Sequence, residues 1–254
     1  MVLYVYAITR NSVMPDTDAV DGSRHFGGVC GEKICAVYTA VDEHAYSQEV
    51  IDRRAGDLEW LGAIGYRHQA VIAALMEQTT AIPLRAFTMF SSETALFEHL
   101  NANAEFLNKT LDRLDGKREY TLRIEIDPEH WSNALVKRVD SLRALAAEID
   151  AASSGKAFLL RKKLDEEKKR ASREAEQQLV SEVESEVIAK LTNDVVAESR
   201  QQREGAFLQI NVLINRDEES RLHELHSSLA DRYASDGVTL AITGPWPPYT
   251  FANV

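Results

Sequence analysis

The sequence has few residues that could cross-link it and no segment suited to anchoring it in a membrane. Among 254 residues there are only two cysteines, Cys30 and Cys35. Two thiols are too few for a disulfide scaffold or a four-thiolate zinc site, so we expect both to be free. No apolar run approaches the roughly 18 residues needed to cross a bilayer, and no basic region precedes the first apolar run as in a signal peptide. We expect a cytoplasmic protein without a membrane partner.

An excess of basic charge is also missing. The chain has 29 Lys and Arg against 40 Asp and Glu, a formal net charge of −11, which argues against a nucleic-acid surface. One basic block lies in the segment 162–173, but acidic residues such as Glu166 stand beside it at helical spacing. Pairs such as Glu166 with Arg170 favour a solvated helix with internal ion pairs.

No group of residues has the spacing of a known catalytic or metal site. The sequence has no phosphate-binding glycine loop and no nucleophile elbow, so we expect no enzyme and no cofactor. His223 and His226 share a helical segment, but their spacing does not match the zinc-protease motif. His68 lies on an apolar stripe and is predicted to be a core residue rather than a base. Arg85, centred in an apolar strand, is predicted to form a structural ion pair rather than an anion site.

Hydrophobic periodicity predicts an α+β protein with two domains, the first covering residues 1–117. Apolar and β-branched residues favour strands at 3–8, 24–30, 33–41 and 82–90, the second and third paired across a two-residue turn. Apolar residues three or four apart predict helices at 57–79 and 96–114.

The second domain, residues 118–254, is predicted to be ferredoxin-like with a long helical insertion at about 156–199. Alternating apolar residues predict strands at 120–126, 208–214 and 238–242, and a fourth strand must come from elsewhere. The insertion repeats apolar residues every four positions, so its apolar stripe rotates around a straight helix. We expect a break near Ser181 or a face that winds around a partner such as the helix 131–150.

Four segments carry a resemblance to a known family. Leu3–Ile8, the pair Tyr66–Met76 and Ile82–Phe90, and the closing Gly244–Phe251 resemble, in order, segments of the gas vesicle F/L family, accessory proteins of gas-filled flotation organelles. Gln69 replaces an acidic residue of the family pattern, and Ala86-Phe87 replaces its usual Phe-Gly. The segments are shared by F and L members, so they do not distinguish the two.

The resemblance implies a non-enzymatic protein of the gas vesicle that binds the small apolar shell subunit and other accessory proteins. We expect it to assist nucleation and assembly as a minor vesicle component. Candidate contact residues are Tyr4 and Tyr6 on the first strand, Arg85, and Trp246 and Tyr249 in the rigid C-terminal segment. The first strand is the favoured surface, because a strand edge can accept a strand from a partner.

Two other hypotheses stay open. One is a small-molecule or anion-binding α+β domain with a regulatory or enzymatic role, centred on Arg85 and His68. The other is a helical scaffold that recruits assembly proteins through residues 156–199. The C-terminal segment itself either packs on its own domain or presents Trp246 and Tyr249 to a partner.

Overall fold

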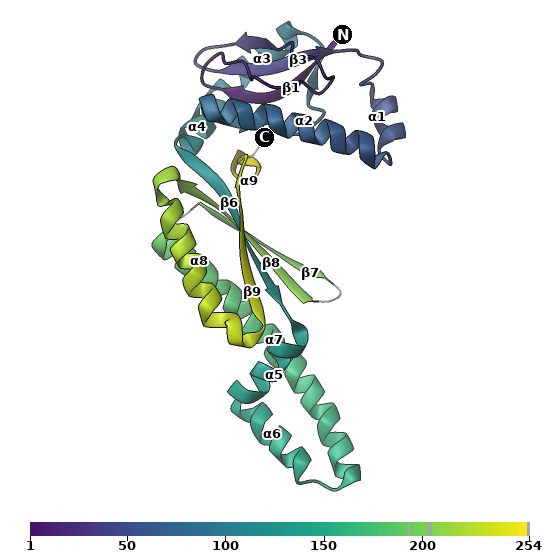
Figure 1. Cartoon of the computed structure of the whole chain (residues 1–254), viewed down its shortest axis with the longest axis vertical. Coiled ribbons are helices and arrows are strands. Elements are labelled where there is room, and N and C mark those ends of the chain that lie inside the picture. The colour runs from purple at the N-terminus through teal and green to yellow at the C-terminus, as the bar shows by residue number, and fades with distance from the viewer. Residues whose placement is uncertain (193, 203–204, 253–254) are drawn as a thin grey trace. The chain divides into compact units, whose positions relative to one another are not determined.

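The computed structural model describes residues 1–192, 194–202 and 205–252, and the chain forms two compact units (Figure 1). Unit 1 contains residues 1–118 and the segment that begins at Trp246, and unit 2 contains residues 119–245. Two antiparallel sheets with covering helices confirm the α+β class. The C-terminal segment belongs to unit 1, whereas we expected it in the second domain. Phe251 is buried and Tyr249 is partly buried in this unit, as described below.

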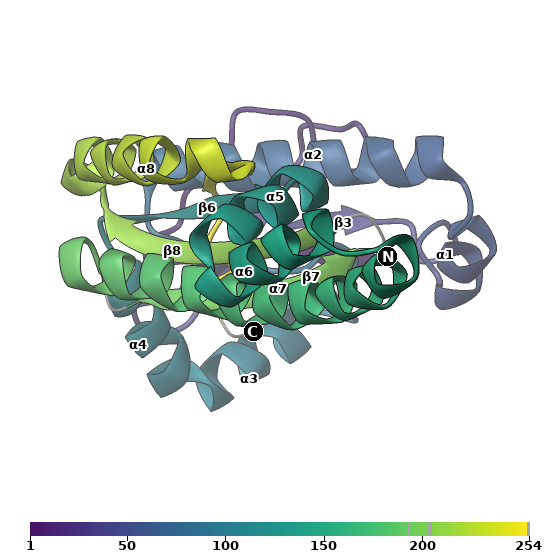
Figure 2. The ribbon, with the colours of Figure 1, turned by 90° about the horizontal axis from the view of Figure 1, so that it is seen from below.

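Unit 1 is built on a sheet with the order β2-β3-β1-β4, in which β5 also pairs with β1. The strands are β1 (Val2–Thr9), β2 (Gly27–Cys30), β3 (Cys35–Val41), β4 (Ala81–Pro83) and β5 (Met89–Phe90). Its helices are α1 (Gln48–Arg54), α2 (Leu58–Gln78), α3 (Glu93–Ala102), α4 (Ala104–Leu114) and α9 (Tyr249–Ala252). The two views place α2 on one side of β1 and β3 and α3 on the other (Figures 1 and 2).

A β-bulge in β1 decides which side chains reach each face of this sheet. Val5 is paired with Tyr38 and Ala7 with Val37, so Tyr6 has no partner in the register. The extra residue shifts the alternation of side chains by one position. Tyr4, Tyr6 and Ala7 therefore share the core beneath α2, whereas Ile8 faces α3 and α4.

The hairpin of β2 and β3 corrects the prediction of free thiols. Its turn spans residues 31–34 instead of the expected two, with Gly31 N–H donating to the Ile34 carbonyl at 2.9 Å. The longer turn pairs Cys30 with Cys35, and the two form a disulfide. A two-residue turn would place Lys33 opposite Cys30. The predicted turn length therefore excluded the pairing of Cys30 with Cys35.

Unit 2 carries the sheet β7-β8-β6-β9. Its strands are β6 (Lys117–Ile126), β7 (Val195–Gln202), β8 (Gly205–Asn215) and β9 (Val238–Trp246). Its helices are α5 (Pro128–Arg138), α6 (Asp140–Asp150), α7 (Ser154–Lys190) and α8 (Glu219–Tyr233), with 3-10 turns η1 (Arg216–Glu218) and η2 (Ala234–Asp236). The missing fourth strand is β7, which begins inside the segment predicted to be helical.

Helix α7 is continuous over 37 residues, so the predicted break near Ser181 is wrong. Its N-terminal part packs on α5 and α6, and Leu179, Val183 and Val187 enter the core of the sheet and α8 (Figure 1). The four-residue repeat rotates the apolar stripe along the helix. Successive parts of the stripe therefore face different partners, first α5 and α6 and then the sheet and α8. The predicted helix 131–150 is two helices, α5 and α6, which meet at Val139.

Candidate functional site

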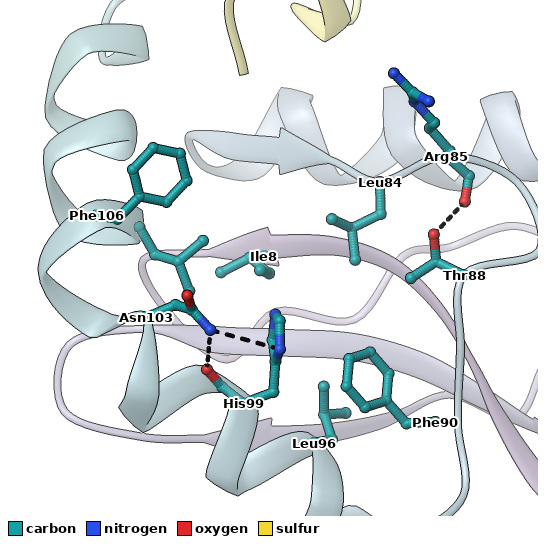
Figure 3. Close-up of a pocket in the computed structure, with 10 residues that line it drawn as sticks. Ile8, Leu84, Arg85, Thr88, Phe90, Leu96, His99, Asn103 and Phe106 are labelled. Carbon is teal, nitrogen blue, oxygen red and sulfur yellow. Dashed lines mark hydrogen bonds between the residues drawn. The ribbon is translucent and has the colours of Figure 1, made fainter. Parts of the chain in front are cut away.

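The candidate site is an apolar cavity of about 680 Å³ in unit 1, between the sheet and the helices α3 and α4 (Figure 3). Most of its wall is hydrocarbon, and no acidic side chain lines it. The lining residues come from β1, β5, the β4–β5 connection, α3 and α4: Ile8, Leu84, Arg85, Thr88, Phe90, Leu96, His99, Asn103, Phe106 and Leu107. A cavity of this volume lies within the range of ligand and side-chain pockets.

A turn between β4 and β5 forms one rim of the cavity. We expected a single strand over 82–90, but the backbone leaves the sheet after Pro83 and returns at Met89. Leu84 N–H donates to the Tyr6 carbonyl at 2.9 Å, and Thr88 N–H closes the turn on the Arg85 carbonyl at 3.1 Å. Phe87 has a φ of 65°, a left-handed conformation that is unfavourable for an aromatic residue and must be held by its surroundings.

Two buried side chains hold this turn. The Tyr4 hydroxyl accepts a hydrogen bond from Phe87 N–H at 3.1 Å and lies 3.1 Å from His68 Nδ1. His68 Nε2 lies 3.0 Å from the Leu84 carbonyl. A carbonyl can only accept, so Nε2 carries the imidazole proton and Nδ1 accepts from the tyrosine hydroxyl. With neutral His68, every donor in this chain of hydrogen bonds meets an acceptor.

Burial keeps His68 in that neutral form. The side chain is 1% exposed, and desolvation lowers the pKa of its imidazole, although the bond to Leu84 opposes the shift. Both ring nitrogens are occupied within the protein, so His68 is a satisfied core residue, as predicted. It does not line the cavity.

The opposite wall comes from the junction of α3 and α4, which we expected to be one helix. Asn103 separates them, and its side-chain amide donates to the His99 carbonyl at 2.8 Å and approaches His99 Nδ1 at 3.5 Å (Figure 3). The rings of Phe90 and His99 pack edge to face, 5.2 Å apart. Phe106 stands at the cavity with 45% of its surface exposed.

Sequence reasoning missed these wall residues because they come from separate elements. The break at Asn103 had a signal, since Asn is a common residue at helix starts and ends. The switch of Ile8 to this face had none, because a bulge is not encoded in a simple alternation of residues.

Tyr4 and Tyr6 are not surface residues, which corrects their proposed role as contacts. Both side chains are 0% exposed and pack beneath α2. Their strand is not an edge either, because β3 lies on one side of β1 and both β4 and β5 lie on the other. Strand addition at β1 is therefore blocked.

Arg85 also differs from the prediction. Its residue is exposed in the turn, so the burial that would have required an ion pair does not occur. The side chain points away from the cavity, while its backbone carbonyl accepts from Thr88 Oγ1 at 2.7 Å (Figure 3). Arg85 and His68 are thus joined through the turn but do not face a common space.

The C-terminal segment packs mainly on unit 1. Phe251 is 1% exposed, and the Arg113 guanidinium lies over its ring at 5.4 Å. The Tyr249 hydroxyl accepts from Gln69 Nε2 at 3.2 Å, and burial raises the pKa of that hydroxyl to about 12. Trp246 keeps 47% of its surface exposed. Tyr249 and Phe251 therefore pack within the first unit, whereas Trp246 is exposed.

The remaining candidates lie in unit 2. His226 Nε2 lies 3.0 Å from the Leu240 carbonyl, so this histidine is tied to β9. In the part of the chain that the structure describes, no three His, Cys, Asp or Glu side chains are grouped to hold a metal. Arg170 pairs with Glu167 and Glu174 along α7, in place of the predicted Glu166. Within the same described ranges, no helix has both the length and the apolar character of a membrane span.

The fold and the cavity define an α+β protein with an apolar cavity in its first unit. The family model "Gas vesicle synthesis protein GvpL/GvpF" matches residues 2–253, so the chain belongs to the gas vesicle GvpL/GvpF family. It is 33% identical to gas vesicle protein L2 of Halobacterium salinarum over 73% of this chain and 69% of that protein. It is 27% identical to gas vesicle protein L of a Streptomyces species, covering 99% and 92% of the two chains.

Solved structures share the fold. The crystal structure of GvpF from Microcystis aeruginosa matches with a TM-score of 0.68 at 16% identity, covering 100% of this chain and 99% of that one. GvpF from Anabaena matches with a TM-score of 0.69 at 16% identity, covering 100% and 96%. Membership of this family gives the protein a gas vesicle-related role.

Proposed function

We propose that this protein is a non-enzymatic assembly factor that binds the apolar shell subunit of the gas vesicle and assists nucleation. It acts as a minor vesicle component and also contacts other accessory proteins. The observation that carries the proposal is the open apolar cavity of unit 1, with half-exposed Phe106 at its wall. A subunit that tiles a gas-facing wall exposes apolar surface, worth about 25 cal/mol per Å² when it is hidden from water.

The chemistry of the cavity supports an apolar side chain as the occupant. Leu84, Phe90 and Leu96 offer hydrocarbon contacts, and the imidazole of His99 is a polar group that can hydrogen-bond to a peptide. Both edges of β1 are covered, which argues against strand addition. The shell subunit would therefore bind by inserting an anchor residue into the cavity. The net charge of −11 would keep a complex with an apolar subunit in solution.

The small-molecule or anion-binding alternative would require a cavity lined by both Arg85 and His68. His68 lies outside the lining, and the guanidinium of Arg85 points away from the cavity (Figure 3). Neither observation favours that alternative over an apolar partner segment.

The test is capture of purified shell subunit by the immobilised protein. Phe106→Glu places a charge at the cavity, and Phe97→Glu is the matched control because Phe97 is 43% exposed on α3 but does not line the cavity. We expect capture to fall with Phe106→Glu and to survive Phe97→Glu. Equal capture by both variants would reject the cavity as the binding site. No capture by the unmodified protein would reject direct binding and leave recruitment of other assembly proteins.

A further inference from the structure

Helix α7 has opposite charges in its two halves. Residues 156–173 contain eight basic and three acidic residues, whereas residues 174–190 contain five acidic residues and one lysine. The basic half is unusual in a chain with a net charge of −11. Ion pairs within the chain account for only part of this pattern. Lys163 and Glu184 form no salt bridge within the described ranges, although Lys163 adds to the effect of Lys156 in lowering the pKa of Glu148 on α6.

A continuous solvent-facing stripe runs along this helix. Its members recur every three or four residues, apart from the adjacent pair Arg173 and Glu174, and at 3.6 residues per turn they stay within a band about 100° wide. The stripe contains Leu159, Lys163, Glu166, Arg170, Arg173, Glu174, Gln177, Ser181, Glu184 and Ile188. All are exposed except the half-buried Glu184. The stripe differs from the buried stripe, which rotates to face α5, α6 and then the sheet.

The order of residues in this stripe is self-complementary. Two copies placed antiparallel, with the two-fold axis between residues 173 and 174, bring Leu159 opposite Ile188 and Lys163 opposite Glu184. The same register brings Arg173 opposite Glu174 at the centre. Leu159 and Ile188 are 67% and 44% exposed, so each end of the stripe carries a large apolar residue.

We propose that two copies of this chain associate through antiparallel pairing of their α7 helices. A two-fold interface uses the same surface twice, so every favourable pair occurs twice. Parallel pairing would place like charges opposite each other, which selects the antiparallel direction. The paired stretch from Leu159 to Ile188 is about 44 Å long at 1.5 Å per residue. The overall negative charge opposes association, so we expect a dimer that forms with rising concentration.

The test uses charge reversal of one pair, with association measured by sedimentation velocity over a range of concentrations. Lys163→Glu and Glu184→Lys each convert two attractive contacts into two repulsive ones, and we expect each to weaken the dimer about tenfold. The double variant restores both contacts in each dimer, so association should return to the unmodified level. Circular dichroism checks that all three variants remain folded.

A monomer at every concentration would overturn the proposal. Dimer association that is unchanged by either single charge reversal would also overturn the proposal, because association would then use another surface. Failure of the double variant to recover would reject this register.

Spin-label distances test the direction independently. The two native cysteines are joined to each other, so one introduced cysteine supplies the label site. In the antiparallel dimer, labels at Ser181 lie about 22 Å apart along the axis, and labels at Lys162 about 34 Å apart. Equal short distances at both positions would indicate parallel pairing and reject the model.

Discussion

The Tyr4 hydroxyl is the most informative single group to remove. Tyr4→Phe deletes one oxygen from a fully buried side chain and leaves the ring in place, so little cavity is created. It removes the acceptor of Phe87 N–H and the donor to His68 Nδ1, both at 3.1 Å. Leaving buried polar groups without partners costs about 1–3 kcal/mol of unfolding free energy. Most of this loss should fall on the strained turn at Phe87, because the Phe87 amide is held by the Tyr4 hydroxyl.

Hydrogen exchange by mass spectrometry measures this effect locally. We expect peptides covering residues 84–88 to exchange about 10- to 100-fold faster in Tyr4→Phe, with smaller changes in unit 2. Tyr66→Phe is the matched control, since Tyr66 is 78% exposed on α2 and its hydroxyl is in solvent. Unchanged exchange at 84–88 in a folded Tyr4→Phe variant would refute the claim that the hydroxyl holds the turn.

Three further predictions concern stability. Burial lowers the pKa of His68 in the folded state, so neutral His68 contributes fully to the free energy of unfolding above the unfolded pKa of about 6.5. That contribution is lost as pH falls, by up to about 1.4 kcal/mol per pH unit. In urea titrations, the free energy of unfolding of His68→Gln should therefore depend less on pH between 7 and 5.5 than that of the unmodified protein. Replacing Cys30 and Cys35 together by serine should cost about 2 kcal/mol, the value for a short closed loop, measured as a fall in Tm that reductant reproduces in the unmodified protein. Phe251→Ala should cost about 3–5 kcal/mol in urea unfolding, and Trp246→Ala, at a 47% exposed position, clearly less.

Much of the fold could be predicted because it depends on local patterns. Helix α2 begins after the Asp57 cap and presents Ile64, His68 and Leu75 to the core, as its spacing indicates. The strands β6, β8 and β9 follow from simple alternation. The fourth strand, β7, is hidden by the apolar spacing, which continues past the end of α7 to Leu191 and Val195. Periodicity alone does not mark where a long helix stops.

The site was less predictable because it depends on two departures from regular structure. The bulge at Tyr6 changes the direction of Ile8, and the turn at 84–88 takes Arg85 out of the sheet. The turn's sequence carried a partial warning, since Phe87 stands where the family pattern has glycine and its φ is positive. The turn is held by Tyr4, which contacts His68 and Phe87 from a distant part of the chain, and the Tyr6 carbonyl at the bulge accepts from Leu84 N–H. No local rule contains such long-range contacts.

If both proposals hold, the dimer gives the protein a property that neither surface has alone. Each copy carries one cavity in unit 1 and one α7 stripe in unit 2, so a dimer presents two cavities. A shell is a repeated array of one subunit, and two linked weak sites bind an array more tightly than one site does. Lys163→Glu should therefore keep its capture of isolated subunit but lose retention on a densely coated surface, and the added Glu184→Lys should restore it. Loss of capture on sparse and dense surfaces alike would show that the substitution weakens the cavity itself, and would reject the avidity explanation.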